Sequence, residues 1–399
     1  MNGFAQEMQA VAKVEIQGNT RTKSVYLKRF IQLKEGMRTD SVMIRNDLRR
    51  LRNLPSIMSA EARFMEHDSS VDLVYHVEER LTLFPVGDFG ITEGNFWIGA
   101  GAMESNLSGR GLYVYGYYQY NVLHTTHLIF RNPYLFASPW GIELEFKNLP
   151  SFEQSGDSLR YQNQLTSLRG AIRYELMLEN EIVLGLAYRK DIAQDLQLTY
   201  IDPLPIINLH RSSVELSLRH EIRKLDFNAF YIQGWKNEIQ LSGLFPLNAE
   251  YNRIGLIYNE FSAYQRTGTK GNVAMRFLLG LSTEKLEFFQ PFIADSYYNL
   301  RGIGYRIFRG NAMGVMNLEY RHTLYENPIA GIQGTLFIDS GYLNDSKNPL
   351  RDEVLYMFSG AGIRIIYKKA YNAILCIDYG LNVRNPREGG WVVGWGQYF

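Results

Sequence analysis

The stretch YYNLRGIGYRIFRGN, residues 297–311, contains three arginines and three glycines. Residues of these types could bind a phosphate, contact nucleic acid, or form a loop that folds back into a polar cavity. A phosphate loop would need the pattern GxxxxGK followed by Ser or Thr and then a helix, which the sequence lacks. A net charge of +1 gives no overall attraction to nucleic acid. The remaining hypothesis is a loop that folds back into a polar cavity, and whether such a cavity exists depends on the strands or helices around the stretch.

Other residues that could take part in chemistry are weaker candidates for a functional site. His124 and His127 could pair on a metal, but in a strand their side chains point to opposite faces. Cys376 is the only cysteine, which excludes an internal disulfide and a cysteine zinc site within one chain. No GxSxG nucleophile motif occurs, and the acidic residues form no paired-carboxylate pattern. We therefore predict no enzyme, no metal site and no cofactor.

The composition favours strands with one apolar and one polar face. The 399 residues include 27 Tyr, 22 Phe and 5 Trp, yet the mean hydropathy is slightly polar at -0.22. This combination is typical of the aromatic girdles of a membrane barrel, with a soluble all-β protein as the alternative. No run of about 18 apolar residues occurs, so the sequence predicts no transmembrane helix.

Residues 11–80 have the periodicity of one small α+β domain with the order β-α-α-β-β. Asp40 can cap the second helix, and Val14 and Ile16 alternate in the first strand. The predicted elements are a strand over 11–18, helices over 25–33 and 40–54, and strands over 60–67 and 71–78. Residues 1–10 are interpreted as an N-terminal remnant or linker, because Gly3-Phe4-Ala5 resembles the end of a signal sequence.

From residue 81 onward, segments of about ten residues alternate apolar and polar side chains between turn residues. Four consecutive segments each put apolar residues on one face and charged residues on the other: 312–324, 334–341, 361–367 and 373–379. About 320 residues at roughly 20 per strand and connection give 16 strands, an even number that suits a membrane barrel. We predict a membrane β-barrel of about 16 antiparallel strands over residues 81–399, with a long inward loop at about 296–312.

Several short motifs of the chain match those of one known family. They are Val14-x-Ile16-x-Gly18-Asn19, Val77-Glu78-Glu79, Glu104 to Gly111, Arg131-Asn132-Pro133-Tyr134-Leu135, Leu300-Arg301-Gly302, Glu319 and Phe337-Ile338-Asp339-Ser340-Gly341. These residues resemble the BamA/TamA-type outer-membrane assembly and secretion superfamily, of the bacterial surface antigen type. The resemblance implies a single POTRA domain followed by a 16-strand barrel. Ile303 departs from the pattern, since an aromatic residue commonly follows the motif glycine, and residues 151–270 align poorly.

The resemblance also implies what the arginine stretch does. As the family's loop 6, it would fold into the lumen and place Arg301 beside the inward-facing Glu319 and Asp339. An arginine in a narrow lumen needs such partners, because an unpaired and partly dehydrated guanidinium is costly. Its planar fork suits carboxylates better than an ammonium does. The predicted loop-6 lock consists of Arg301, Gly302, Glu319, Asp339 and Gly341.

The last residues, WVVGWGQYF, predict a final strand with one apolar face. Trp391, Val393, Trp395 and Phe399 would share that face. A terminal strand that ends in an aromatic residue resembles the signal by which outer-membrane barrels are recognised for insertion. The resemblance therefore assigns a C-terminal insertion signal to Trp395 and Phe399.

The barrel is expected to close by pairing its first strand, near residues 95–103, with its last strand. Gly99 and Gly101 lie in the former, and Gly394 and Gly396 lie in the latter. Because glycine weakens strands, we interpret this seam as a lateral gate through which a client strand enters the membrane. Close packing between strands is the alternative reason for these glycines.

The resemblance implies a protein of the bacterial outer membrane whose POTRA domain lies in the periplasm and contacts clients by adding a strand to its sheet. The leading hypothesis is a barrel that inserts or translocates other polypeptides. Its partners would be the lipid bilayer, unfolded outer-membrane proteins and periplasmic or outer-membrane accessory subunits, with no nucleic acid. A protein-secretion pore is one alternative. The barrel anchor of a patatin-like phospholipase, with its catalytic domain outside this chain, is another.

Overall fold

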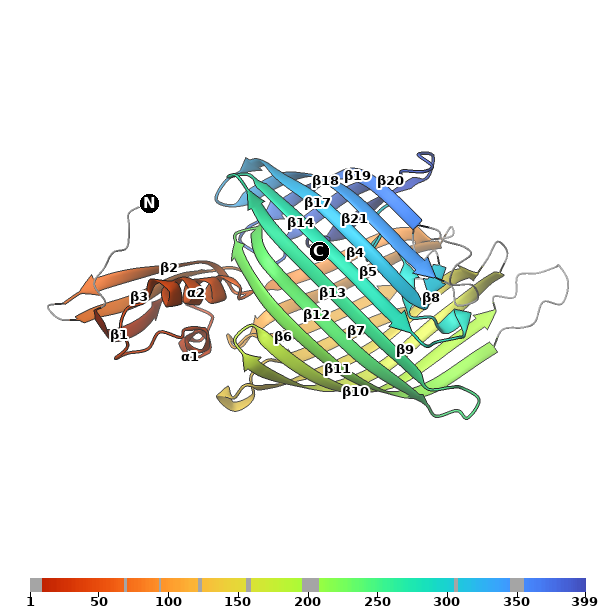
Figure 1. Ribbon diagram of the computed structural model, residues 1–399, viewed down its shortest axis with the longest axis horizontal. Helices are drawn as coiled ribbons and strands as arrows, with labels where there is room; N and C mark the ends of the chain where they lie inside the picture. Colours follow the sequence, from red (N-terminus) through yellow and green to blue (C-terminus); the bar gives the residue numbers. More distant parts are fainter. Residues whose placement is uncertain are drawn as a thin grey trace.

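The computed structural model describes residues 9–67, 70–92, 95–120, 124–155, 159–195, 208–304, 308–344 and 355–399. A small N-terminal domain lies at one end of a large β-barrel (Figure 1). In the described ranges, no helix combines the length and the apolar character needed to cross a membrane. Most of the predicted N-terminal remnant, residues 1–8, lies outside these ranges.

The N-terminal domain has the predicted order of strands and helices. Its elements are β1 (Ala10–Gln17), α1 (Ser24–Leu27), the 3-10 turn η1 (Lys28–Phe30), α2 (Ser41–Arg52), β2 (Ile57–Glu66) and β3 (Ser70–Glu79). The sheet order is β1-β3-β2, with β1 parallel and β2 antiparallel to β3. The carboxylate of Asp40 caps α2 by accepting from the main-chain nitrogen of Val42 at 2.7 Å.

The first helix is shorter than the predicted 25–33, because a buried side chain competes for its backbone. The main-chain nitrogens of Gln32 and Leu33 donate to the carboxylate of Asp47, at 2.8 and 3.1 Å. These bonds replace the helical ones, and the chain is already extended at Ile31. Asp47 is fully buried, so its charge also requires these donors and the hydroxyl of Tyr75 at 2.9 Å.

The barrel is one sheet of sixteen antiparallel strands in the described ranges, which confirms the predicted fold class. The strands are β4 (Leu83–Thr92), β5 (Asn95–Leu107), β6 (Leu112–Tyr120), β7 (His124–Asn132), β8 (Trp140–Ser155), β9 (Leu159–Met177), β10 (Asn180–Asp195), β11 (Asn208–Asn228), β12 (Tyr231–Pro246), β13 (Ile254–Thr267), β14 (Gly271–Ser282), β17 (Ala312–Glu326), β18 (Ala330–Asn344), β19 (Leu355–Tyr367), β20 (Ile374–Asn382) and β21 (Gly389–Trp395). The 3-10 turn η2 (Leu135–Ala137) connects β7 to β8.

The wall of the barrel is apolar outside and charged inside. Along β17, Leu318 and Tyr320 are 40% and 38% exposed. The residues that alternate with them, Asn317, Glu319 and Arg321, are fully buried. Exposed apolar rows around buried charges are the reverse of a soluble protein and suit a wall between lipid and lumen. Burial also alternates over the predicted segments in β18, β19 and β20, so the alternation predicted for all four segments is present.

The first barrel strand is β4 rather than residues 95–103, so that prediction was wrong. β5, which contains residues 95–103, is the second strand and pairs with β4 on one side and β6 on the other. Pro85 and the glycines around it obscured β4 in the sequence. A strand at the edge of a sheet tolerates proline, because one row of its backbone groups has no ladder partner.

Candidate functional site

Loop 6 connects β14 to β17 and returns into the barrel. It contains the 3-10 turn η3 (Glu287–Phe289) and a short antiparallel pair, β15 (Phe292–Ala294) with β16 (Phe308–Gly310). At its tip, Leu300 and Arg301 have no exposed surface. Leu300 packs in a cluster with side chains of β14, β17, β18 and β19, so the tip of the loop lies against the inner wall.

The structure brings Arg301 to the two carboxylates predicted for it. Its Nε and Nη2 donate to the two carboxylate oxygens of Asp339, at 2.8 and 2.9 Å. Its main-chain nitrogen donates to the same carboxylate at 3.0 Å, and its Nη1 donates to Glu319. All three side chains are fully buried. This is the two-pronged geometry that a guanidinium makes and an ammonium cannot.

The ionic cluster is larger than the predicted lock. Glu319 also accepts from Arg321 Nε at 2.6 Å and from Arg364 Nη2 at 3.2 Å. Asp378 accepts from Arg364 Nη1 and Nη2, at 2.6 and 2.9 Å, and lies 3.4 Å from Arg301 Nη1. Together with Arg301 and Asp339, these residues form three guanidinium and three carboxylate groups. Equal numbers of opposite charges make their burial tolerable.

Strand periodicity could have identified the additional members. Arg321, Arg364 and Asp378 each fall on the inward face of a strand, at positions the alternation already marked as polar. Sequence reasoning did not establish that they meet, because that depends on how β17, β19 and β20 are staggered.

Two glycines of the predicted lock have steric roles. Gly302 has φ +96°, and a Cβ there would lie 2.6 Å from the carbonyl oxygen of Gly380 on β20. A side chain at Gly341 would lie 2.7 Å from Leu300, so its absence makes room for the loop tip. Glycine at 302 thus permits a left-handed turn pressed against the wall.

The end of the chain departs from the prediction. Trp391, Val393 and Trp395 do share the exposed face of β21, but Phe399 does not continue it. Gly396 has φ +88°, and the following residues turn into the barrel, where Phe399 packs against an interior cluster around Leu225 of β11. The predicted common face was wrong at Phe399, because the glycine ends the strand.

The seam lies between β4 and β21, the two ends of the sheet order. In the part of the chain that the structure describes, no backbone ladder joins these strands. They meet through Trp395, whose Nε1 donates to the carbonyl oxygen of Gly87 at 3.0 Å and whose ring contacts that of Phe84 at 5.4 Å between centroids. β21 has only seven residues, against fifteen in β17.

Only one of the four predicted seam glycines belongs to a seam strand. Gly394 lies in β21 and pairs with Cys376 of β20. Gly99 and Gly101 lie in β5, where they pair with Asp88 and Val86 of β4, and Gly396 follows the end of β21. The prediction was wrong for Gly99 and Gly101 because it began the barrel one strand too late, and for Gly396 because β21 ends at Trp395.

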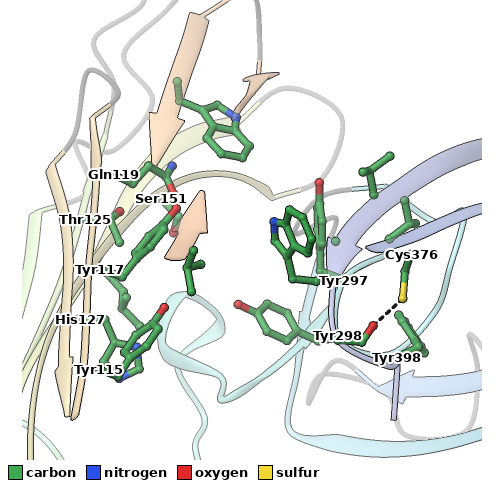
Figure 2. Close-up of a pocket in the computed structure, with 18 of the residues that line it drawn as sticks. Tyr115, Tyr117, Gln119, Thr125, His127, Ser151, Tyr297, Tyr298, Cys376 and Tyr398 are labelled. Carbon is green, nitrogen blue, oxygen red and sulfur yellow. Dashed lines mark hydrogen bonds between the residues drawn. The ribbon is translucent and has the colours of Figure 1, made fainter. Parts of the chain in front are cut away.

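A cavity of about 450 Å³ lies in the lumen beside the seam (Figure 2). Its lining includes Val86 of β4 and residues 392–395 of β21, so it adjoins both seam strands. Figure 2 shows Tyr115 and Tyr117 on one side of it, with Tyr298 of loop 6 on the other. An aromatic chamber of this kind can hold apolar side chains of a bound polypeptide.

His127 also lines this cavity, and its Nε2 lies 2.9 Å from a carboxylate oxygen of Glu145. His124 is exposed and contacts Tyr118 instead, so the two histidines face opposite sides as predicted. Among the residues described, no group of three His, Cys, Asp or Glu side chains could hold a metal.

The N-terminal domain docks on the rim of the barrel through charged and aromatic contacts. Arg49 of α2 donates to Glu179 at 2.7 Å, and Arg52 donates to both oxygens of Asp226 at 2.8 and 3.0 Å. The guanidinium of Arg29 lies 3.9 Å from the ring centroid of Tyr134. These contacts reach the turns before β8 and β10 and the last residues of β11, so the domain lies against this part of the barrel mouth.

Three comparisons relate these features to known proteins. The family model described as the Omp85 superfamily domain matches residues 106–399, and a POTRA model, described as a surface antigen variable number repeat, matches residues 9–80. No curated protein matches the chain significantly.

Solved structures of similar fold include BamA from Haemophilus ducreyi lacking POTRA domains 1–3. That structure is 17% identical with a TM-score of 0.60, over 98% of this chain and 85% of that one. CdiB from Escherichia coli is 12% identical with a TM-score of 0.64, over 97% and 76% of the two chains. CdiB from Acinetobacter baumannii is 12% identical with a TM-score of 0.58, over 97% and 73%. At these identities the likeness concerns the fold.

Proposed function

This chain belongs to the Omp85 superfamily, and we propose that it inserts or translocates other polypeptides at the bacterial outer membrane. The barrel lies in the outer membrane, and its POTRA domain lies in the periplasm. The clients of the proposed activity are unfolded outer-membrane proteins. We propose no catalytic role and no cofactor for this chain.

The observation that carries the proposal is the seam. Two strands that end a sheet offer rows of backbone donors and acceptors to any extended segment that approaches. Here β4 and β21 contact each other through the side chain of Trp395, and the described residues form no ladder between them. Separating them therefore breaks few hydrogen bonds. An entering client strand can pair with an edge that is already available.

The POTRA domain offers a client a second free strand edge. β2 forms one edge of its sheet, whereas residues 36 and 37 bond to the opposite edge at Val11 of β1. An extended client segment can add to the β2 edge by main-chain hydrogen bonds, without a required sequence. The domain contacts the barrel mouth, so a segment held there lies near the opening of the lumen.

We also propose that the ionic cluster around Arg301 holds loop 6 in the lumen, and that Trp395 and Phe399 belong to an insertion signal. The cluster ties loop 6 to β17, β18 and β20 without covalent bonds, so the loop is fixed but releasable. A secretion pore would require this loop to leave the lumen. Ion conductance in a planar bilayer tests that alternative, which predicts open channels in Arg301→Ala but not in the parent protein.

A reversible bridge across the seam tests the main proposal. In a Cys376→Ser background, Phe84→Cys and Trp395→Cys are joined by a short bismaleimide with a reducible centre. Insertion of a client barrel into proteoliposomes should fall when the bridge forms and recover when it is reduced. The matched control joins cysteines at Leu318 and Ile338, which face each other on β17 and β18 inside the sheet. Full insertion by the seam-bridged protein would refute the proposal.

A further inference from the structure

Two aromatic rings contact the guanidinium of Arg301, and one of them comes from the end of the chain. The ring centroid of Phe337 lies 3.6 Å from Arg301 Cζ, and that of Tyr398 lies 4.2 Å from it. Phe337 belongs to the motif that also supplies Asp339. Tyr398 belongs to the segment after β21, which nothing in the sequence related to loop 6. Attraction between a cation and a ring face is strongest where water is excluded, as it is here.

The same segment contacts loop 6 at a second point. The hydroxyl of Tyr398 donates to the carbonyl oxygen of Ser296 at 2.9 Å, five residues before Arg301. Its neighbour Phe399 accepts a hydrogen bond at its main-chain oxygen from Arg321 Nη2 at 3.0 Å. Arg321 in turn donates to Glu319, which is a carboxylate partner of Arg301. The segment therefore contacts two arginines of the ionic cluster, Arg301 through Tyr398 and Arg321 through Phe399.

The base of this segment is fixed to the barrel wall. The main-chain nitrogen of Gly396 donates to the carbonyl oxygen of Ile374 at 2.8 Å, and the thiol of Cys376 donates to the carbonyl oxygen of Gly396. The positive φ of Gly396 then directs residues 397–399 inward. Trp395, which makes the seam contacts with β4, is only three residues from Tyr398.

From these contacts we infer that Tyr398 is a positioning residue for loop 6. Its ring holds the Arg301 guanidinium against its carboxylates, and its hydroxyl holds the preceding turn of the loop. Because Tyr398 continues from β21, displacement of that seam strand withdraws the ring and loosens the loop. The coupling to the seam rests on the proposed function, whereas the clamp on Arg301 does not.

A buried reporter on loop 6 tests the clamp. Ala294 of β15 has no exposed surface and packs in the cluster that contains Leu300, so Ala294→Cys in a Cys376→Ser background reacts with a maleimide only when the loop lifts. In nanodiscs, Tyr398→Leu should raise the labelling rate, because leucine keeps much of the volume but lacks the ring face and the hydroxyl. Tyr398→Phe should raise it less. Gln397→Ala, the matched control in the same segment, should leave it unchanged.

The decisive comparison is made without Arg301. If the ring of Tyr398 acts through that guanidinium, Tyr398→Leu should raise the labelling rate by a smaller factor in Arg301→Ala than in the parent, because only the hydroxyl bond to Ser296 is then left to lose. An equal factor in both backgrounds would show a general packing role and overturn the inference. So would labelling of Tyr398→Leu at the parent rate, or an increase in Gln397→Ala as large as in Tyr398→Leu.

A separate variant tests the coupling. Trp395→Ala removes the seam contacts and should also raise labelling at residue 294. Unchanged labelling would overturn the coupling while the clamp stands. The assay contains no client, so its outcome is independent of the bridging experiment on the seam.

Discussion

Removing Arg301 tests the lock most directly. In Arg301→Ala, Asp339 loses the two donors Nε and Nη2, and Glu319 loses Nη1. Breaking a buried ion pair from one side costs roughly 3–5 kcal/mol, against about 0–1 kcal/mol for a solvated surface pair. Because the lock is fully buried, the barrel should lose about 3–5 kcal/mol of unfolding free energy.

The remaining contacts place the expected value near the lower end of that range. Glu319 keeps Arg321 and Arg364, so its charge stays compensated. Asp339 keeps the amide of Asn317 at 2.8 Å and the main-chain nitrogen of residue 301 at 3.0 Å. Most of the loss is thus the partly unpaired charge of Asp339 and the freed loop.

Urea unfolding in lipid vesicles, followed by the shift between folded and unfolded bands in gels, measures this loss. Arg301→Lys should recover only part of it, because an ammonium cannot engage a carboxylate with two parallel bonds. Arg384→Ala, at an exposed arginine of the connection between β20 and β21, is the control and should be nearly neutral.

A double-mutant cycle gives the result that would refute the reasoning. Asp339→Asn removes the charge that Arg301→Ala leaves unpaired, so the two changes together should cost less than their sum by about 0.5–3 kcal/mol. Strict additivity would mean that the two side chains do not act as a pair. The lock would then be wrong, whatever the size of each single effect.

Three further outcomes are expected. Leu318→Arg on the lipid face should cost about 2–4 kcal/mol of unfolding free energy in vesicles if it lies near the bilayer midplane, whereas Thr125→Arg in the luminal cavity should cost much less. Burial opposes ionisation of Glu79 in the POTRA domain, but hydrogen bonds from residues 20–22 lower its pKa to about 2. Because the pKa is lowered, the stabilisation is present above pH 4.5 and is lost as the pH falls toward 2, and Glu79→Gln should flatten that part of a thermal-unfolding profile. Deleting Phe399 should reduce the amount of folded barrel recovered from outer membranes, and unchanged recovery would refute the proposed insertion signal.

The structure changes one expectation about luminal positions. From the alternation alone, a charge at Asn317 on the polar face of β17 should be mild. Instead Asn317 is fully buried, donates to Asp339, and accepts from Arg276 Nε at 2.9 Å. Polarity of a strand face therefore does not indicate how much free space lies in front of it. Loop 6 fills this part of the lumen, and an added charge there would have to displace it.

Local pattern was enough to predict the fold class and much of the candidate site. Alternation with a period of two determines which face of a strand each side chain occupies, so Glu319 and Asp339 could be placed in the lumen from the sequence. The predicted strand number also held, since it needs only the chain length and an average repeat. The Arg301 contact came from motif resemblance rather than from alternation, because loop residues have no period.

What the sequence could not determine depends on where distant strands come together. Arg364 and Asp378 join the lock because the stagger of β17 to β20 brings their inward positions to one level. Tyr398 meets Arg301, 97 positions away in the numbering, only because Gly396 turns the chain inward while loop 6 folds back. Local periodicity identifies faces, whereas register, closure and loop return decide contacts, and these are properties of the whole barrel.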